Sequence, residues 1–150
     1  MKTLYDIAEL QDDTIKLTLS RLLQKGHRDA GEMPIYMFNI RRLDGVMVGQ
    51  CNLLAGHNPK MYYTGNIGYG IWECYRGQHY GLRAARLLVR LAANLGMEEV
   101  YLLIDTDNLP SLRIAQHLGA ENLGIVDVPP GNIEYLKGSR QKYRYRLILS

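Results

Sequence analysis

The first half of the chain carries a strand-like alternation of apolar and polar residues. Over 14–20 and again over 36–41, every second residue is apolar, which is the period of a half-buried β-strand. Asp44-Gly45 then marks a turn, and apolar positions resume in a segment that runs to about residue 54. The pattern predicts a first strand, an antiparallel hairpin and a further strand over 66–73.

The period changes after this strand. From 81 to 95 apolar residues recur at spacings of three and four, while Arg83, Arg86 and Arg90 occupy another stripe. This predicts an amphipathic helix that Gly96 closes. The other expected elements are a helical turn at 4–10, a strand at 99–105, a short helix at about 109–118, and strands near 122–128 and 142–149, with longer connections at 22–34 and 128–141.

This order of elements predicts an α/β (α+β) fold with a mixed, mostly antiparallel sheet. The strand, helix and strand from 66 to 105 form a β-α-β unit, which implies parallel strands joined by a right-handed crossover. No repeat or linker interrupts the sequence, so we expect one domain over 1–150.

Composition and charge exclude several classes of protein. The chain is 47% hydrophobic, but its apolar runs are far shorter than a membrane span, so we expect a soluble, cytoplasmic protein without a membrane partner. Cys51 and Cys74 have no disulfide or metal-like spacing and are expected to be reduced. A net charge of +3 suits an anionic ligand and does not favour a dedicated nucleic-acid binder.

Candidate chemistry concentrates in the segment 67–81, where a strand passes through a tight loop into a helix start. Free N–H groups and the helix dipole make such a start an anion site, and Gly77 and Gly81 leave room for phosphates, with Arg76 adding attraction. The spacing matches neither a Walker loop nor a Rossmann fingerprint. On spacing alone, the glycines are equally well explained as turn residues.

Two motifs resemble those of the GNAT acetyltransferases. The loop Arg76-Gly-Gln-His-Tyr-Gly81 is similar to the family's pyrophosphate loop, Arg/Gln-x-x-Gly-x-Gly/Ala. Asn108-Leu-Pro-Ser111, followed by Leu118-Gly119-Ala120, is similar to the Asn-x-x-Ser and Leu-Gly-Phe elements of the next helix. Residues 67–120 carry the resemblance, and the order of strands fits the whole chain.

The resemblance implies an N-acetyltransferase that moves an acetyl group from acetyl-CoA directly to a primary amine of an unidentified small molecule or peptide. It also implies helices on both faces of the sheet, and a strand bulge at Ile71 whose backbone groups bond the pantetheine arm. The cofactor-binding residues that it implies are Ile71, Trp72, Arg76, Gly77, Gln78, His79, Tyr80, Gly81, Asn108 and Ser111.

The chain departs from the family at two positions. His79 replaces the first loop glycine, although histidine tolerates some unusual backbone geometry. Ala115 stands where the family often has a tyrosine that protonates the departing thiolate. These departures favour a competing hypothesis, a non-catalytic acyl-CoA-binding or regulatory module.

Candidate catalytic groups are few. Glu73 is the first candidate for the base, Tyr143 for a late acid, and backbone N–H groups near Ile71 and Trp72 for stabilising the oxyanion. The alternatives are a surface carboxylate at Glu73 and sheet packing at Tyr143. No pair of histidines has metal-binding spacing, so no metal is expected.

Basic residues and the acceptor site leave further alternatives open. Arg83 could reach a cofactor phosphate or lie on a solvated helix face, while Lys142, Arg144 and Arg146 share a strand face that could contact nucleic acid or an acidic substrate. The connection over 22–34 is shorter than the two helices of the family. The acceptor pocket is therefore expected to be open or to be completed by a second subunit in a homodimer.

Overall fold

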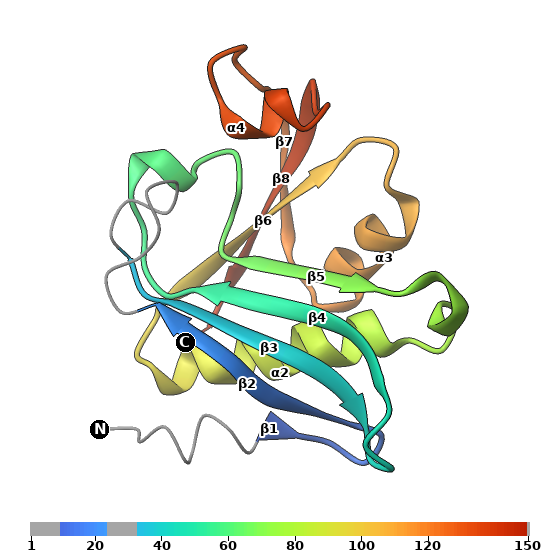
Figure 1. Ribbon diagram of the computed structural model, residues 1–150. Helices are drawn as coiled ribbons and strands as arrows, with labels where there is room; N and C mark the ends of the chain where they lie inside the picture. The colour runs from blue at the N-terminus through green and yellow to red at the C-terminus, as the bar shows by residue number, and fades with distance from the viewer. Residues whose placement is uncertain (1–9, 24–32, 150) are drawn as a thin grey trace.

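The computed structural model describes residues 10–23 and 33–149. Five antiparallel strands form the larger sheet, in the order β1-β2-β3-β4-β5 (Figure 1). They are β1 (Leu10–Gln11), β2 (Ile15–Leu23), β3 (Ile35–Arg42), β4 (Met47–Leu54) and β5 (Ile67–Ile71). The sequence predicts the last four, and β1 was not expected.

Residues 4–9 of the predicted helical turn lie outside the described residues, and Leu10 belongs to a strand. Most of the predicted connection 22–34 also lies outside them. The Asp44-Gly45 turn is confirmed, and the positive φ of 94° at Gly45 explains the glycine there.

The predicted amphipathic helix is α2 (Tyr80–Asn94), which packs on one face of the larger sheet. Small and aliphatic residues between Ala84 and Ala92 face the strands, and Leu88 is fully buried against them. Leu95 caps the helix, and Gly96 follows with a φ of 87°, as expected of a terminating glycine. Burying this apolar stripe fixes the start of α2 against β5.

The second half of the chain builds a smaller, three-stranded antiparallel sheet in the order β6-β8-β7. The short helix α3 packs against it through Leu112 and Ala115. The elements are β6 (Glu99–Asp105), α3 (Leu109–His117), β7 (Glu121–Asp127), α4 (Ile133–Leu136) and β8 (Gln141–Ile148), with 3-10 turns η2 (Pro59–Met61) and η3 (Glu73–Tyr75) earlier in the chain. The sequence did not predict α4 or the two 3-10 turns.

The single mixed sheet expected from the sequence is divided into two between β5 and β6. Figure 1 shows the two arrows running toward the same side and diverging, and no parallel ladder joins them within the described residues. At their starts the side chain of Asn66 takes the place of further backbone pairing. Its Oδ1 accepts a bond of 2.8 Å from the Tyr101 N–H, while the main-chain N–H of Asn66 donates to the Tyr101 carbonyl at 2.8 Å.

Asn66 also joins β5 to the chain beside it. Its Nδ2 donates to the carbonyls of Leu54 and Gly56 at 3.0 and 2.8 Å, and its side chain is fully buried. Every polar atom of this amide therefore has a partner, as a buried amide requires. The two strands are held at one end and separate beyond it.

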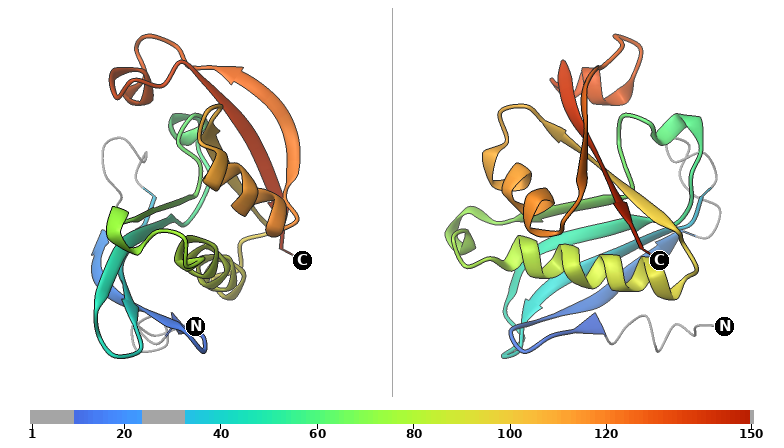
Figure 2. Two further views of the ribbon diagram at one scale, coloured as in Figure 1. Left: turned by 90° about the vertical axis from the view of Figure 1, so that its right-hand side faces the viewer. Right: turned by 180° about the vertical axis from the view of Figure 1, so that it is seen from behind.

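The expectation of helices on both faces is met only in part. Both α2 and α3 lie on the same side of the strands, as the edge-on view in Figure 2 shows. On the other side of the smaller sheet lies the four-residue α4, which contacts Lys142 of β8. No helix within residues 10–23 and 33–149 covers the other face of the larger sheet.

Replacing Asn66 with alanine should destabilise the protein by about 3 kcal/mol, because it leaves the Tyr101 N–H and the Gly56 carbonyl without their buried partner, while the Leu54 carbonyl keeps only the Gly56 N–H. Urea unfolding measures this change. Asn39→Ala is the matched control, because Asn39 of β3 lies on the face of the larger sheet opposite α2. It should change the free energy of unfolding by less than about 0.5 kcal/mol. Equal effects of the two substitutions would show that Asn66 does not hold the strands together.

Candidate active site

A cleft lies where β5 and β6 diverge. Its walls come from Ile67–Tyr69 of β5 and Leu102–Asp105 of β6, and the start of α3 contributes Asn108 and Ser111. Lys142 of β8 completes the lining of a cavity of about 190 Å³. Two of the predicted cofactor-binding residues, Asn108 and Ser111, therefore face the same space as the strand that leads to the phosphate loop.

The edge of β5 presents backbone hydrogen-bonding groups to this cleft. The Leu54 N–H donates to the Asn66 carbonyl, and the Trp72 N–H donates to the Val48 carbonyl. Hydrogen-bonded pairs alternate along an antiparallel ladder, so residues 68 and 70 also bond to β4. The backbone groups of Ile67, Tyr69 and Ile71 consequently point away from β4, toward the side where β6 has diverged.

The loop after β5 leads to the start of α2. Gly77 has a φ of 89°, and His79, the residue before the helix, has a φ of 63° with no side-chain cap. The first N–H to bond back along the helix is that of Arg83, to the His79 carbonyl, so the three N–H groups over 80–82 precede the helical ladder. Uncapped donors at the positive end of a helix favour an anion.

His79 adopts the left-handed backbone conformation that its glycine-like position requires. The sequence argument that a histidine tolerates this geometry is confirmed. Gly81 was expected to leave room for phosphates, but a Cβ there would lie 3.2 Å from the Ile114 side chain and 3.7 Å from the Tyr69 ring. Its bare Cα permits close packing of α2 against α3 and β5, so the glycine does not by itself indicate a phosphate path.

The bulge implied for Ile71 is absent. Pairing of β4 with β5 is regular from Ile67 to Ile71, and the register shift lies between β3 and β4, around Val48. The predicted oxyanion donor near Trp72 also needs correction, because the Trp72 N–H already donates to the Val48 carbonyl at 3.0 Å. Of the two expected donors, the Ile71 N–H is the one that faces the cleft.

A hydroxyl pair that sequence reasoning missed lies in the cleft. The Tyr69 hydroxyl and the Ser111 Oγ are 2.6 Å apart. Burial raises the pKa of Tyr69, and the hydrogen bond with Ser111 only partly offsets that rise. Tyr69 is therefore a neutral hydroxyl throughout the physiological range. Its position in an alternating strand predicts a packed ring but not this partner, which comes from a helix 42 positions along the chain.

The two predicted catalytic side chains are not brought together. Glu73 lies exposed in η3, and Tyr143 packs with Tyr145 and the residues beneath α3. Neither lines the cleft. Lys142, which precedes Tyr143 in β8, lines the cleft instead, because adjacent residues of a strand point to opposite faces. Roles for Glu73 and Tyr143 remain predictions.

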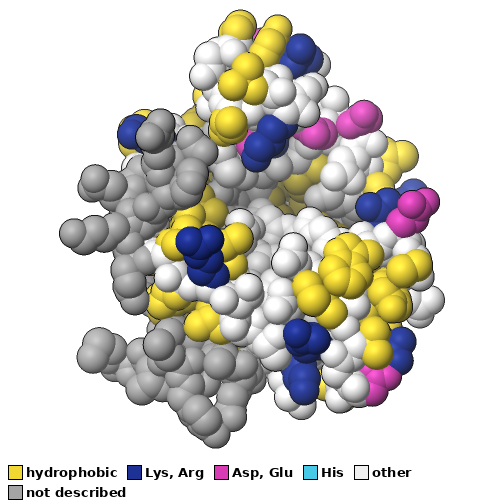
Figure 3. Space-filling model, viewed as in Figure 1, with side chains coloured by type: hydrophobic (Ala, Val, Ile, Leu, Met, Phe, Trp, Pro, Cys, Tyr) yellow, Lys and Arg dark blue, Asp and Glu magenta, His cyan; other side chains and the backbone are white. Residues whose placement is uncertain are grey.

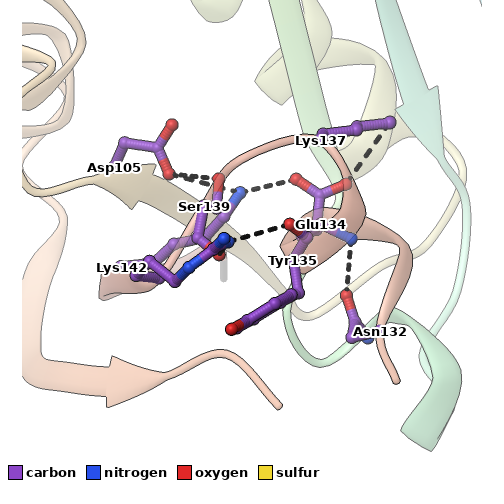
Figure 4. A network of polar contacts seen from close by, with 8 residues as sticks. Asp105, Asn132, Glu134, Tyr135, Lys137, Ser139 and Lys142 are labelled. Carbon is purple, nitrogen blue, oxygen red and sulfur yellow. Dashed lines mark hydrogen bonds and ion pairs between the residues drawn. The ribbon is translucent and has the colours of Figure 1, made fainter. Parts of the chain in front are cut away.

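Lys142 belongs to a polar network at one end of the cleft (Figure 4). Its Nζ lies 2.7 Å from Glu134 Oε1 and 4.0 Å from Asp105 Oδ1. The Ser139 hydroxyl donates to the same Asp105 oxygen at 2.7 Å, and Lys137 lies 3.4 Å from the other Glu134 oxygen. The network fastens α4 to β6 and β8, and its members Asp105 and Lys142 line the cleft.

The other basic candidates are engaged within the protein. Arg83 contacts Asp12 and Asp13 at 3.1 and 2.9 Å, so it fastens α2 to the turn after β1 and does not reach toward the phosphate loop. Arg144 lies between the rings of Tyr62 and Tyr101, 4.0 Å from each centroid. Arg146 pairs with Glu121 at 2.8 Å. The predicted cationic strip on β8 is consequently occupied by internal partners.

Other chemistry finds little support in the described part of the chain. Burial raises the pKa of the Cys51 thiol to about 12, so it is not a nucleophile at neutral pH. The residues that the structure describes include no cluster of three or more His, Cys, Asp or Glu able to hold a metal. None of their helices is long and apolar enough to cross a bilayer.

The sequence profile of the Acetyltransferase (GNAT) domain family matches the chain over residues 5–121. The protein belongs to the GNAT acetyltransferases. The match includes the diverging strands, the loop over 76–81 and the start of α3. The family expected from the two motifs is therefore confirmed.

Solved structures similar to this GNAT protein share its fold at low sequence identity. A candidate ribosomal-protein-serine acetyltransferase from Vibrio cholerae has 22% identity and a TM-score of 0.56, covering 76% of this chain and 64% of its own. A Salmonella typhimurium protein solved with its cofactor acetyl-CoA has 18% identity and a TM-score of 0.59, covering 77% and 65%. A ribosomal L7/L12 alpha-N-protein acetyltransferase has 19% identity and a TM-score of 0.57, and the match covers 77% of this chain and 70% of its own.

These likenesses confirm the predicted fold class. The chain spans 64% and 65% of the first two proteins, somewhat under two thirds of each. At such identities the comparison establishes the GNAT fold, and the roles of individual residues must be argued from the geometry of this chain.

The Lys142–Glu134 pair should contribute strongly to stability because both side chains are buried, at 7% and 12% exposure. Lys142→Met should lower the free energy of unfolding by about 3 kcal/mol by leaving a buried carboxylate poorly paired. Lys137→Met is the control, because Lys137 is 66% exposed and its pair should contribute less than about 1 kcal/mol. Urea unfolding of both variants measures the difference, and equal losses would contradict a buried pair.

Proposed function

We propose that this protein is an acetyl-CoA-dependent N-acetyltransferase that transfers the acetyl group directly to a primary amine. The observation that carries the proposal is the free edge of β5. On this edge the backbone groups of β5 are not paired with another strand. They face a cleft that leads to the uncapped N–H groups at the start of α2. A β-strand edge suits the amides of a pantetheine arm, and a helix start suits a diphosphate.

The binding roles follow from this arrangement. The loop Arg76–Gly81 holds the diphosphate through main-chain N–H groups, while Arg76 itself donates through Nε to the Ile71 carbonyl at 3.0 Å and steadies the loop. Ile71 and Tyr69 offer backbone groups to the pantetheine arm. Asn108 caps α3 through the Ser111 N–H, which places the Ser111 hydroxyl at the cleft.

The transfer needs two things from the protein, a donor for the carbonyl oxygen and a route for one proton. A neutral amine attacks the thioester carbonyl, so a C–N bond forms, the C–S bond breaks, and the proton that the nitrogen loses replaces the one that the thiolate takes up. The Ile71 N–H is the donor placed to stabilise the carbonyl oxygen. The Tyr69–Ser111 hydroxyl pair is the best-placed proton source, so Ala115 does not remove every acid from the cleft.

The proposal treats residues 1–150 as one acetyltransferase domain acting in the cytoplasm, where acetyl-CoA is available. Free Cys51 and Cys74 agree with a reducing compartment. Two similar structures are named as acetyltransferases of ribosomal proteins, which favours a peptide amine as acceptor. A homodimer that completes the acceptor site is retained as a prediction for sedimentation analysis.

A thiol-release assay tests the proposal against the non-catalytic alternative. The purified protein is incubated with acetyl-CoA and a panel of peptide and small-molecule amines. We expect amine-dependent release of free thiol, with one acetyl group gained per thiol by mass spectrometry. Thermal stabilisation by acetyl-CoA without thiol release would identify a binding module instead. A coenzyme concentration of 100 times its Kd should stabilise an enzyme or a binding module alike, by about 2.7 kcal/mol.

A carboxylate at residue 78 should weaken acetyl-CoA binding through repulsion of the diphosphate. We expect Gln78→Glu to raise the Kd about tenfold, measured by calorimetry at low salt. Gln116→Glu, on the exposed side of α3, is the matched control and should leave the Kd unchanged. S-acetylpantetheine, which lacks the diphosphate, should bind both variants alike, and a loss of its binding to Gln78→Glu would contradict the phosphate assignment.

A further inference from the structure

The face of the larger sheet opposite α2 carries rows of uncharged polar side chains. Residues directly opposite each other in antiparallel strands share a face, and one such row runs from Thr18 through Asn39 and Gln50 to Gly70. A second row places Met37 beside Asn52 and Gly68. We call this surface the open face.

The charged side chains that β2 to β5 place on the open face are all cationic. The strand registers place Lys16, Arg21 and Arg41 there, and no Asp or Glu of β2 to β5 accompanies them. Arg41 donates to the Thr18 hydroxyl and the Gly45 carbonyl, neither of which carries charge. No carboxylate among the described residues lies within ion-pair distance of these three.

Figure 3 views this side of the molecule. Outside its grey region, Lys and Arg groups lie over the sheet among hydrophobic as well as white surface, and most of the Asp and Glu groups lie away from the centre of this face. The carboxylate nearest to the reaction cleft, Asp105, accepts the Ser139 hydroxyl and faces Lys142. Within residues 10–23 and 33–149, no carboxylate pairs with the cations that the strands place on the open face.

The open face is continuous with the cleft. A hollow lined by Ser20, Met37, Gln50 and Asn52 shares Gly68 and Tyr69 with the cleft between β5 and β6. Gly68 has no side chain to obstruct this border. An extended acceptor lying on the open face can thus bring its amine to the cleft across β5.

We propose that the acceptor is the N-terminal α-amine of a peptide segment whose following residues are acidic or uncharged, and that this segment docks on the open face. This inference rests on the proposed function and names its substrate class. The amide rows supply hydrogen bonds for an extended backbone, and the three cations supply attraction for acidic side chains. Cationic acceptors such as polyamines would meet like charge.

An α-amine fits the chemistry better than a lysine side chain. The hollow has no carboxylate among the described residues, and the carboxylate that lines the cleft, Asp105, is engaged by Ser139 and Lys142. We therefore expect the acceptor to supply a neutral amine itself. With a pKa of about 8, roughly a tenth of an α-amine is neutral at pH 7, against less than about 0.1% of a lysine amine near 10.4. Nucleic acid would also be attracted to cations but brings no alkyl amine.

The test uses three synthetic heptapeptides with a shared N-terminal serine, in which alanine alternates with glutamate, glutamine or lysine. We measure kcat/KM by thiol release from acetyl-CoA, and the affinity of each peptide by calorimetry with coenzyme A present. The glutamate peptide should exceed the lysine peptide by about tenfold or more at low salt, and the gap should narrow at high salt. The Nα-acetylated glutamate peptide should show no turnover.

Gln50→Glu adds a carboxylate in the middle of the open face and should reduce or invert this preference. Gln116→Glu, on α3, is the matched control and should leave it unchanged. Equal behaviour of the two variants would overturn the docking assignment. So would a wild-type preference for the lysine peptide or spermidine, or tighter binding of a 20-nucleotide RNA than of the glutamate peptide.

The outcomes separate this inference from the proposed function. Turnover of amines with no preference among the three peptides would overturn the substrate class and leave the acetyltransferase proposal standing. Charge-dependent peptide binding that Gln50→Glu abolishes, with no thiol release from any peptide, would support the docking surface and contradict the enzyme.

Discussion

The separation of β5 from β6 depends on the buried amide of Asn66. This side chain takes the place of backbone pairing where two neighbouring strands would otherwise continue as one sheet, and it bonds Tyr101, Leu54 and Gly56. An amide can do this because it offers donors and an acceptor at fixed angles. Beyond this point the strands diverge, and the cleft is the direct result.

The divergence matters because it leaves β5 as a strand edge inside the molecule. Exposed strand edges are normally covered or blunted, since they bind other extended chains. Here the edge is bordered by the start of α3 and leads to an uncapped helix start at residue 80. A ligand with amide groups in its arm and phosphates at its end is complementary to both features at once.

The sequence predicted most of the strands and the two longer helices because these depend on local patterns. Alternation located the strands, and the loop from Arg76 to Gly81 carried the family resemblance. The role of Gly81 in packing against Ile114, the engaged Trp72 N–H and the Tyr69–Ser111 pair depend on contacts between distant segments. Asn66 gave no signal because a single asparagine before a strand is typical of a turn. The alternation along β8 also does not tell which of two neighbours faces the cleft, and the structure places Lys142 in its lining and Tyr143 against the residues beneath α3.

Residue-resolved amide hydrogen exchange with and without coenzyme A tests the central claim most directly, that the cofactor arm bonds to the free edge of β5. The account predicts that the amides of Tyr69 and Ile71 exchange quickly in the free protein and become strongly protected on binding, while residues 68 and 70 are protected in both states. Binding of coenzyme A that leaves the exchange of Tyr69 and Ile71 unchanged would contradict it.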